Sequence, residues 1–184
     1  MVMDTGSVIG FDVNESYCQV SYYNERKQEP QTLEVAADNY QIPLMLTLHN
    51  DKWSFGREAK KMFTLGRGAK AENLYRRACN REKVKLGEKE YESVWLLAKY
   101  ISLILEQFQP ISYLTFSVLH ATEDIRNMLK RIGSHFDVKK DAITVQDYKE
   151  SFCHFVFNQP RELWKYESAM FYCDRSKVEA YMLK

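Results

Sequence analysis

The chain has 184 residues, of which 45% are hydrophobic and 14% aromatic, with only 7 glycines and 4 prolines. This composition can bury a core, and it excludes a disordered or collagen-like chain. Lys and Arg number 26 against 25 Asp and Glu, so the formal net charge of +1 creates no strong field for nucleic acid or a membrane surface. The apolar stretch from Trp95 to Leu105 contains Lys99 and Ser102 and is too short to span a bilayer. We therefore expect a soluble, cytoplasmic protein that binds no nucleic acid and has no membrane span.

The cysteines are scattered along the chain, without a CxxC pair and without a histidine at metal-ligand spacing. We expect them to be buried, reduced thiols, since free cysteine packs like a small apolar residue: Cys18, Cys79, Cys153 and Cys173. The histidines are equally dispersed and indicate neither a catalytic triad nor a metal site: His49, His120, His135 and His154.

The first third of the chain predicts a meander of strands that closes on a helix. Runs of β-branched and aromatic residues at Ser7–Val13 and Tyr17–Tyr23 are joined by the polar pair Asn14-Glu15, a pattern typical of a hairpin. The further elements expected here are the strands Thr32–Ala36, Leu44–Leu48 and Lys52–Phe55 and the helix Gly56–Phe63.

The remainder predicts helices and strands in alternation. The basic, weakly periodic segment Leu65–Glu92 is interpreted as surface loop and short helix, and its cations as a solvated face: Arg76, Arg77, Arg81, Lys83 and Lys85. Apolar residues at helical spacing predict the helices Tyr91–Phe108 and Thr122–Phe136, with Leu129 in the core. Strands are expected at Ile111–Leu119, Val138–Val145 and Phe152–Phe157, then a short helix at Pro160–Tyr166 and a hairpin of Met170–Asp174 and Val178–Leu183. The order predicts an α/β fold with a mixed sheet in which Val8–Val13 lies parallel to Tyr113–Val118.

Four segments resemble, in order, motifs of the actin and heat-shock-chaperone ATPase superfamily. Val8–Val20 is similar to the first phosphate loop, and Tyr40–Pro43 with Trp53–Lys61 to a chaperone-type stretch that follows it. Phe157–Tyr166 resembles the segment before the second phosphate hairpin, whose place is taken by Ala169–Met182. The resemblance implies the first lobe of such an ATPase, a ribonuclease-H-like mixed sheet with flanking helices. Its core would comprise residues 1–41 and 110–184, and residues 42–109 would form a small inserted subdomain.

The resemblance also implies the positions of two phosphate loops. These are Asp12, Asn14, Glu15 and Ser16 on the first hairpin and Asp174, Ser176 and Lys177 on the second. Asp12 and Asp174 would hold Mg²⁺ through water, whereas the catalytic lysine has no secure position, because Lys70, Tyr75 and Arg76 compete for it.

Both loops depart from the family pattern. Neither turn carries the glycines that let backbone N–H groups face an anion. Glu15 adds a negative charge where phosphate oxygens would lie, a like-charge contact of roughly 4 kcal/mol at 4 Å with an effective dielectric constant of about 20.

The family's second lobe, which holds the adenosine, has no counterpart in the chain. The sequence therefore predicts a degenerate lobe that serves as a scaffold or protein-interaction module, with weak or no nucleotide binding, no cofactor and no enzymatic activity by itself. The alternative is the N-terminal half of an active chaperone-like or filament-forming ATPase that binds Mg-ATP once a second lobe completes it. Either prediction requires a protein partner or the missing lobe.

Overall fold

The computed structural model describes residues 6–163, 167–173 and 178–183. Two compact units make up the chain, Met1–Gln146 and Asp147–Lys184. None of the described helices is long and apolar enough to cross a membrane. The predicted division into residues 1–41 with 110–184 and an inserted 42–109 stays a prediction.

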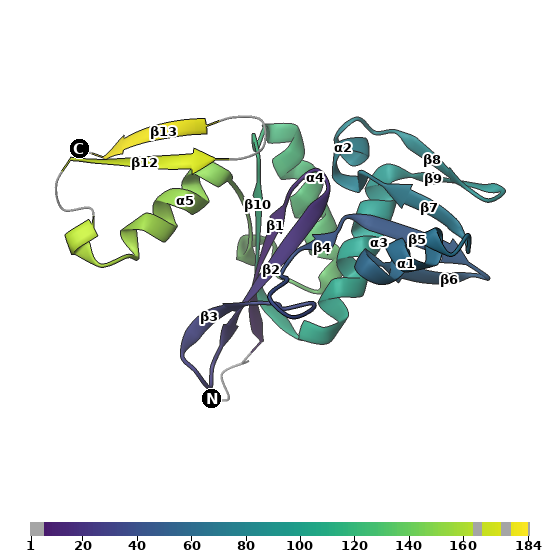
Figure 1. Cartoon of the computed structure of the whole chain (residues 1–184), viewed down its shortest axis with the longest axis horizontal. Coiled ribbons are helices and arrows are strands. Elements are labelled where there is room, and N and C mark those ends of the chain that lie inside the picture. The colour runs from purple at the N-terminus through teal and green to yellow at the C-terminus, as the bar shows by residue number, and fades with distance from the viewer. Residues whose placement is uncertain (1–5, 164–166, 174–177, 184) are drawn as a thin grey trace. The chain divides into compact units, whose positions relative to one another are not determined.

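The first unit is built on a mixed sheet in the order β11–β10–β1–β2–β3, with β4 also paired to β2 (Figure 1). Its strands are β1 (Ser7–Val13), β2 (Tyr17–Asn24), β3 (Glu29–Thr32), β4 (Ile42–Pro43), β10 (Ile111–Val118) and β11 (Ile143–Asp147). β1 pairs antiparallel with β2 and parallel with β10, so the predicted α/β class and the predicted parallel pairing of Val8–Val13 are confirmed. The third strand precedes the predicted Thr32–Ala36, because the pairing with β2 ends at Thr32.

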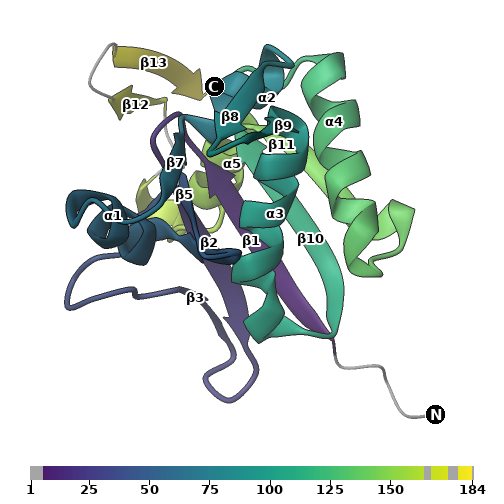
Figure 2. The same cartoon turned by 90° about the vertical axis from the view of Figure 1, so that its right-hand side faces the viewer.

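One face of this sheet carries the core. Ile9, Phe11 and Val13 alternate along β1 toward it and are about 1% exposed. The helices α3 (Ser93–Leu105) and α4 (Glu123–Gly133) lie along this face (Figure 2). Tyr100 of α3 bonds to Cys18 of β2, while Gly133 of α4 lies so close to Phe116 and Ile143 that a Cβ there would come within 3.4 Å of both. Leu129 is 0% exposed, which confirms its predicted place in the core.

The segment between β4 and α3 contains more strands than expected. A three-stranded sheet in the order β6–β5–β7 and a separate hairpin β8–β9 accompany two helices. Their bounds are β5 (Met45–His49), β6 (Lys52–Phe55), α1 (Gly56–Thr64), β7 (Ala69–Glu72), α2 (Leu74–Cys79), β8 (Lys83–Leu86) and β9 (Lys89–Glu92). The prediction of loop and short helix for Leu65–Glu92 was therefore wrong in part. In β8 the exposed Lys83 and Lys85 alternate with the buried Val84 and Leu86. The segment is therefore an amphipathic strand, which its lysines made look like a surface loop.

Short 3-10 helices extend several elements of the first unit: η1 (Glu106–Phe108), η2 (Ser134–Phe136) and η3 (Lys140–Ala142).

The second unit pairs a helix with a hairpin. Its elements are α5 (Tyr148–Phe157), the 3-10 turn η4 (Arg161–Leu163), β12 (Ser168–Cys173) and β13 (Val178–Leu183). The predicted final hairpin is confirmed, but the predicted strand Phe152–Phe157 is helix. Asp147 begins that helix with a capping box: its carboxylate accepts from the first turn, and the Glu150 carboxylate accepts from the Asp147 N–H.

Candidate functional site

The turn between β1 and β2 contains the first set of predicted site residues. It closes with a hydrogen bond from the Asn14 N–H to the Tyr17 carbonyl at 3.0 Å. The side-chain oxygen Oδ1 of Asn14 accepts the backbone N–H of Glu15 at 2.6 Å, and the Ser16 carbonyl accepts the N–H of Leu44 at 2.9 Å. Glu15 and Ser16 are exposed. One N–H at the tip is therefore already bound by a side chain, and a phosphate oxygen would have to displace it.

The second set of predicted site residues cannot be compared with the first. Asp174, Ser176 and Lys177 lie outside the described residues, so the pairing of Asp12 with Asp174 around Mg²⁺ stays a prediction. Within residues 6–163, 167–173 and 178–183, no group of three His, Cys, Asp or Glu side chains is arranged to hold a metal ion.

Asp12 belongs to a face of the sheet that lies opposite α3 and α4. It stands on β1 with Gln19 of β2 and Ser117 of β10 as its register partners. Successive side chains of a strand alternate between faces, so every second residue of these three strands shares the face of Asp12. We call this face the open face. It consists of Val8 and Tyr113 in one row, Ser21, Gly10 and Thr115 in the next, and Gln19, Asp12 and Ser117 in the third. Tyr23 shares this face by alternation with Ser21 and Gln19 along β2 and extends the first row.

The three rows of the open face differ in chemistry. The first row is large and apolar, and Tyr23, Val8 and Tyr113 are 43%, 46% and 59% exposed. The middle row has small side chains around Gly10, which carries none. The third row has a carboxylate, an amide and a hydroxyl. The open face therefore has one row of large, exposed side chains and two rows of smaller, half-buried ones.

The three residues that compete for the place of a catalytic lysine have different surroundings. The Lys70 ammonium pairs with Glu72 at 3.1 Å and lies 4.1 Å from the centre of the Phe63 ring. Tyr75 is buried, whereas Arg76 is exposed on α2. Lys70 pairs with Thr47 in the register of β5 and β7, and the position of a catalytic lysine stays a prediction.

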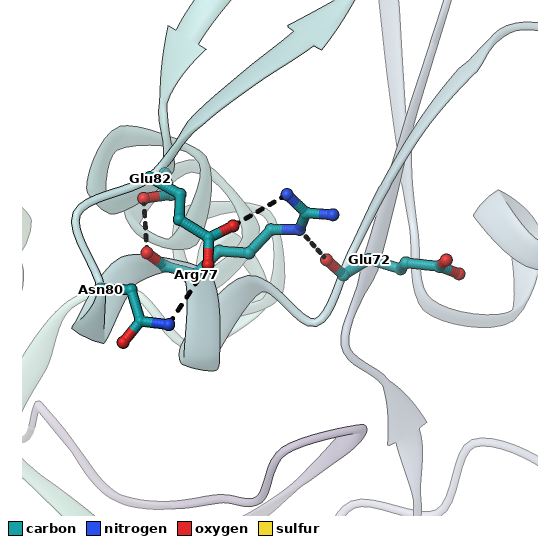
Figure 3. Close-up of polar contacts among 5 residues, drawn as sticks. Glu72, Arg77, Asn80 and Glu82 are labelled. Atoms are coloured by element: carbon teal, nitrogen blue, oxygen red, sulfur yellow. Dashed lines mark hydrogen bonds and ion pairs between the residues drawn. The ribbon is translucent and has the colours of Figure 1, made fainter.

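The basic segment around α2 is held by ion pairs within the first unit (Figure 3). Arg77 donates from Nη1 to the Glu82 carboxylate at 2.9 Å and from Nε to the Glu72 carbonyl at 3.1 Å. Asn80 donates to the other Glu82 oxygen at 3.2 Å. Lys83 lies 3.5 Å from Glu90 and 3.8 Å from Glu92. This arrangement joins α2 to the β8–β9 hairpin.

The cysteines differ in their surroundings. Cys18 is buried, and burial raises the pKa of its thiol to about 12, although the hydrogen bond with Tyr100 lowers it. Burial also raises the pKa of Cys79, which is half-buried, as is Cys153. All three are free thiols, but only Cys18 of these is buried as expected. A thiol with so high a pKa is no nucleophile near neutral pH.

Sequence reasoning missed an aromatic cluster, because Trp53 is far along the chain from Tyr91 and Trp95. The Tyr91 and Trp95 rings stack with centroids 5.3 Å apart, and Trp53 meets each of them at 5.7 Å. Trp95 is 47% exposed. The rings contact one another, so the cluster joins β6, β9 and α3.

Comparison with protein families matches residues 29–184 to the C-terminal family of unknown function DUF5716. No curated protein matches the sequence. The predicted membership of the actin and heat-shock-chaperone ATPase superfamily was therefore wrong. It depended on short motifs that are weak one by one, and their phosphate-binding glycines are missing from this sequence. Since the match extends over most of the sequence, the chain belongs to the DUF5716 C-terminal family.

Proposed function

We propose that this chain is a protein-interaction module, or scaffold, that binds nucleotides weakly or not at all. The observation that carries the proposal is the open face of the central sheet. A sheet whose other face is packed on helices is a rigid support, which suits a surface for a partner.

The composition of the open face supports this function. Tyrosine is enriched at the centres of protein interfaces, because its ring gives a large contact area and its hydroxyl keeps a hydrogen-bonding group. Tyr113 is the register partner of Val8, and Tyr23 lies on the same face of the sheet. Gly10 and its small neighbours would let a partner backbone approach closely. We infer a partner segment that is apolar where it meets the tyrosines.

Weak nucleotide binding follows from the β1–β2 turn. The Glu15 N–H donates to Asn14 rather than to an anion, and the Glu15 carboxylate would repel phosphate oxygens. Both effects oppose triphosphate binding at this turn.

The strand order supports a narrower description of the fold. A central β1 with an antiparallel meander β2–β3 on one side and β10–β11 on the other agrees with the predicted ribonuclease-H-like arrangement. In such a sheet the central strands are anchored on both edges, so the open face would keep its shape when a partner binds.

The experiment uses a photoreactive amino acid in place of Tyr113, with the same amino acid in place of Leu65 as the control. Leu65 is 57% exposed and follows α1, so it belongs to none of the strands of the open face. A protein crosslinked in cells from position 113 and not from position 65 is then purified and titrated with the unmodified chain and with Tyr113→Lys. We expect Tyr113→Lys to weaken binding about tenfold or more and Leu65→Lys to leave it unchanged. Equal affinities for Tyr113→Lys and the unmodified chain would refute the proposal.

A further inference from the structure

The formal charge of the chain is distributed unevenly. Residues 57–70, which extend from the first turn of α1 into β7, contain five Lys and Arg residues and a single acid, Glu58. The rest of the chain contains 21 Lys and Arg against 24 Asp and Glu, because the whole chain has 26 and 25. The small net charge of the chain therefore conceals a positive region in the first unit.

Three of these cations share one side of α1. Arg57, Lys60 and Lys61 have the i, i+3, i+4 spacing that makes side chains neighbours on a helix, and all three are exposed. The opposite side of α1 packs on β5, where Ala59 is buried and its carbonyl accepts a hydrogen bond from the Thr47 hydroxyl at 3.3 Å. We call the side formed by Arg57, Lys60 and Lys61 the cationic face.

The cationic face differs from the neighbouring basic residues in its pairing. Within residues 6–163, 167–173 and 178–183, ion pairs involve Lys70, Arg77 and Lys83, but neither the cationic face nor the exposed Arg67 that follows α1. Like charges at this spacing destabilise a helix, and Arg57 in the first turn opposes the helix dipole. The cations therefore do not serve the stability of α1, which favours a role in binding.

We propose that the cationic face, together with Arg67, binds an acidic segment of a partner protein. Charge complementarity identifies the occupant, because carboxylates of the partner would supply the ion pairs that these cations do not make within the described residues. The second unit has no net charge to offer, since residues 147–184 contain six Lys and Arg and six Asp and Glu. This inference goes beyond the open face, because it gives the scaffold a second docking surface on another element.

The composition of α1 favours a protein segment over a membrane or a nucleic acid. Helices that lie on membranes insert an apolar side next to their cations, whereas the buried side of α1 is already packed on β5. Leu65 is exposed after the helix, but one such side chain would anchor the chain only weakly. Single strands of nucleic acid stack on aromatic rings, and Phe63, the aromatic residue of α1, lies 4.1 Å from the Lys70 ammonium.

The experiment measures binding of a fluorescein-labelled oligomer of L-glutamate to the full-length chain by fluorescence anisotropy. We expect saturable binding that weakens as the salt concentration rises, because exposed charges are screened. Lys60→Glu with Lys61→Glu should raise the Kd at least about tenfold, since two attractions become repulsions. Lys60→Arg with Lys61→Arg keeps the charge and should retain binding.

The matched control is Lys130→Glu with Arg131→Glu on α4. These residues are also adjacent, exposed cations near the end of a helix, so both double variants have the same net charge. α4 and α1 lie on opposite sides of the view in Figure 2, and the control should leave the Kd nearly unchanged. An equal loss of binding in both double variants would overturn the proposal, because net charge alone would explain it. An unmodified chain that does not bind the glutamate oligomer would overturn it as well.

Two other anions test the class of partner. Vesicles of phosphatidylserine with phosphatidylcholine and a single-stranded oligodeoxynucleotide are measured in the same buffer. Tighter binding to either one, lost in Lys60→Glu with Lys61→Glu, would overturn the assignment to a protein segment. Tyr113→Lys should not weaken binding of the glutamate oligomer, so this proposal and that of the open face can fail separately.

Discussion

The hydroxyl of Tyr100 is expected to stabilise the first unit, and Tyr100→Phe tests this with a single atom removed. Tyr100 is 0% exposed on α3, and its hydroxyl lies 3.2 Å from the Ile42 carbonyl, 3.1 Å from the Pro43 carbonyl and 3.2 Å from Cys18 Sγ. These contacts join α3 to β4 and β2, where the chain leaves the central sheet.

The magnitude follows from what the substitution leaves behind. Phenylalanine keeps the edge-to-face contact with Phe55, whose ring centroid is 6.2 Å from that of Tyr100, so packing changes little. The two carbonyls lose a buried donor, and leaving a buried polar group without its partner costs about 1–3 kcal/mol. That is a substantial share of the roughly 5–15 kcal/mol that stabilises a typical domain.

Urea denaturation of both chains, followed by circular dichroism, measures the free energy of unfolding. We expect the midpoint of Tyr100→Phe to fall while the slope stays constant. The control is Tyr113→Phe, because Tyr113 is 59% exposed and should change stability by less than about 0.5 kcal/mol. If Tyr100→Phe and Tyr113→Phe have equal midpoints, the hydroxyl network contributes nothing and the reasoning is refuted.

Three further predictions concern the core, the pH response and nucleotide binding. Leu129→Ala should lower the free energy of unfolding by about 2–5 kcal/mol, whereas the exposed Lys130→Ala should leave the denaturation midpoint in place. The Cys18 pKa rises from 9.0 to about 12 on folding. Its contribution to the free energy of unfolding is therefore complete below pH 9.0 and is lost as the pH rises from 9.0 to about 12. Unfolding free energies measured against pH should therefore fall less steeply in Cys18→Ala above pH 9.0, and parallel curves would contradict the assigned cause. Calorimetry should find Mg-ATP binding no tighter than about millimolar, near −4 kcal/mol. Asn14→Gly with Glu15→Thr should strengthen phosphate binding, and micromolar binding by the unmodified chain would reject the proposed function.

Local patterns in the sequence correctly predicted much of the central sheet. The alternation of Ile9, Phe11 and Val13 with small or polar residues identifies a strand with one buried side, and the helical spacing around Leu129 identifies a helix with one buried side. Strand, helix and strand in succession favour a parallel pair, which β1 and β10 form. These elements were predictable because their own residues carry the period of the structure.

Other elements were mispredicted because their periodicity is hidden. The run Phe152–Phe157 has the composition of a strand. It is helical because the Asp147 capping box begins a helix just upstream, and that helix continues through the run. In β8, lysines alternate with Val84 and Leu86. The prediction gave more weight to the charge of the segment than to this alternation. Weak short motifs likewise suggested an ATPase family to which the chain does not belong.

By itself, the sequence determined the α/β class, the order of most strands and helices, and the absence of glycine from the β1–β2 turn. Only the tertiary structure decided which residues distant in the chain meet, such as Val8 with Tyr113 across β1 and β10, and Tyr100 of α3 with Cys18 of β2. The physical reason is that periodicity records which side of an element avoids water, whereas the partner that covers that side depends on register and packing between residues far apart in the chain.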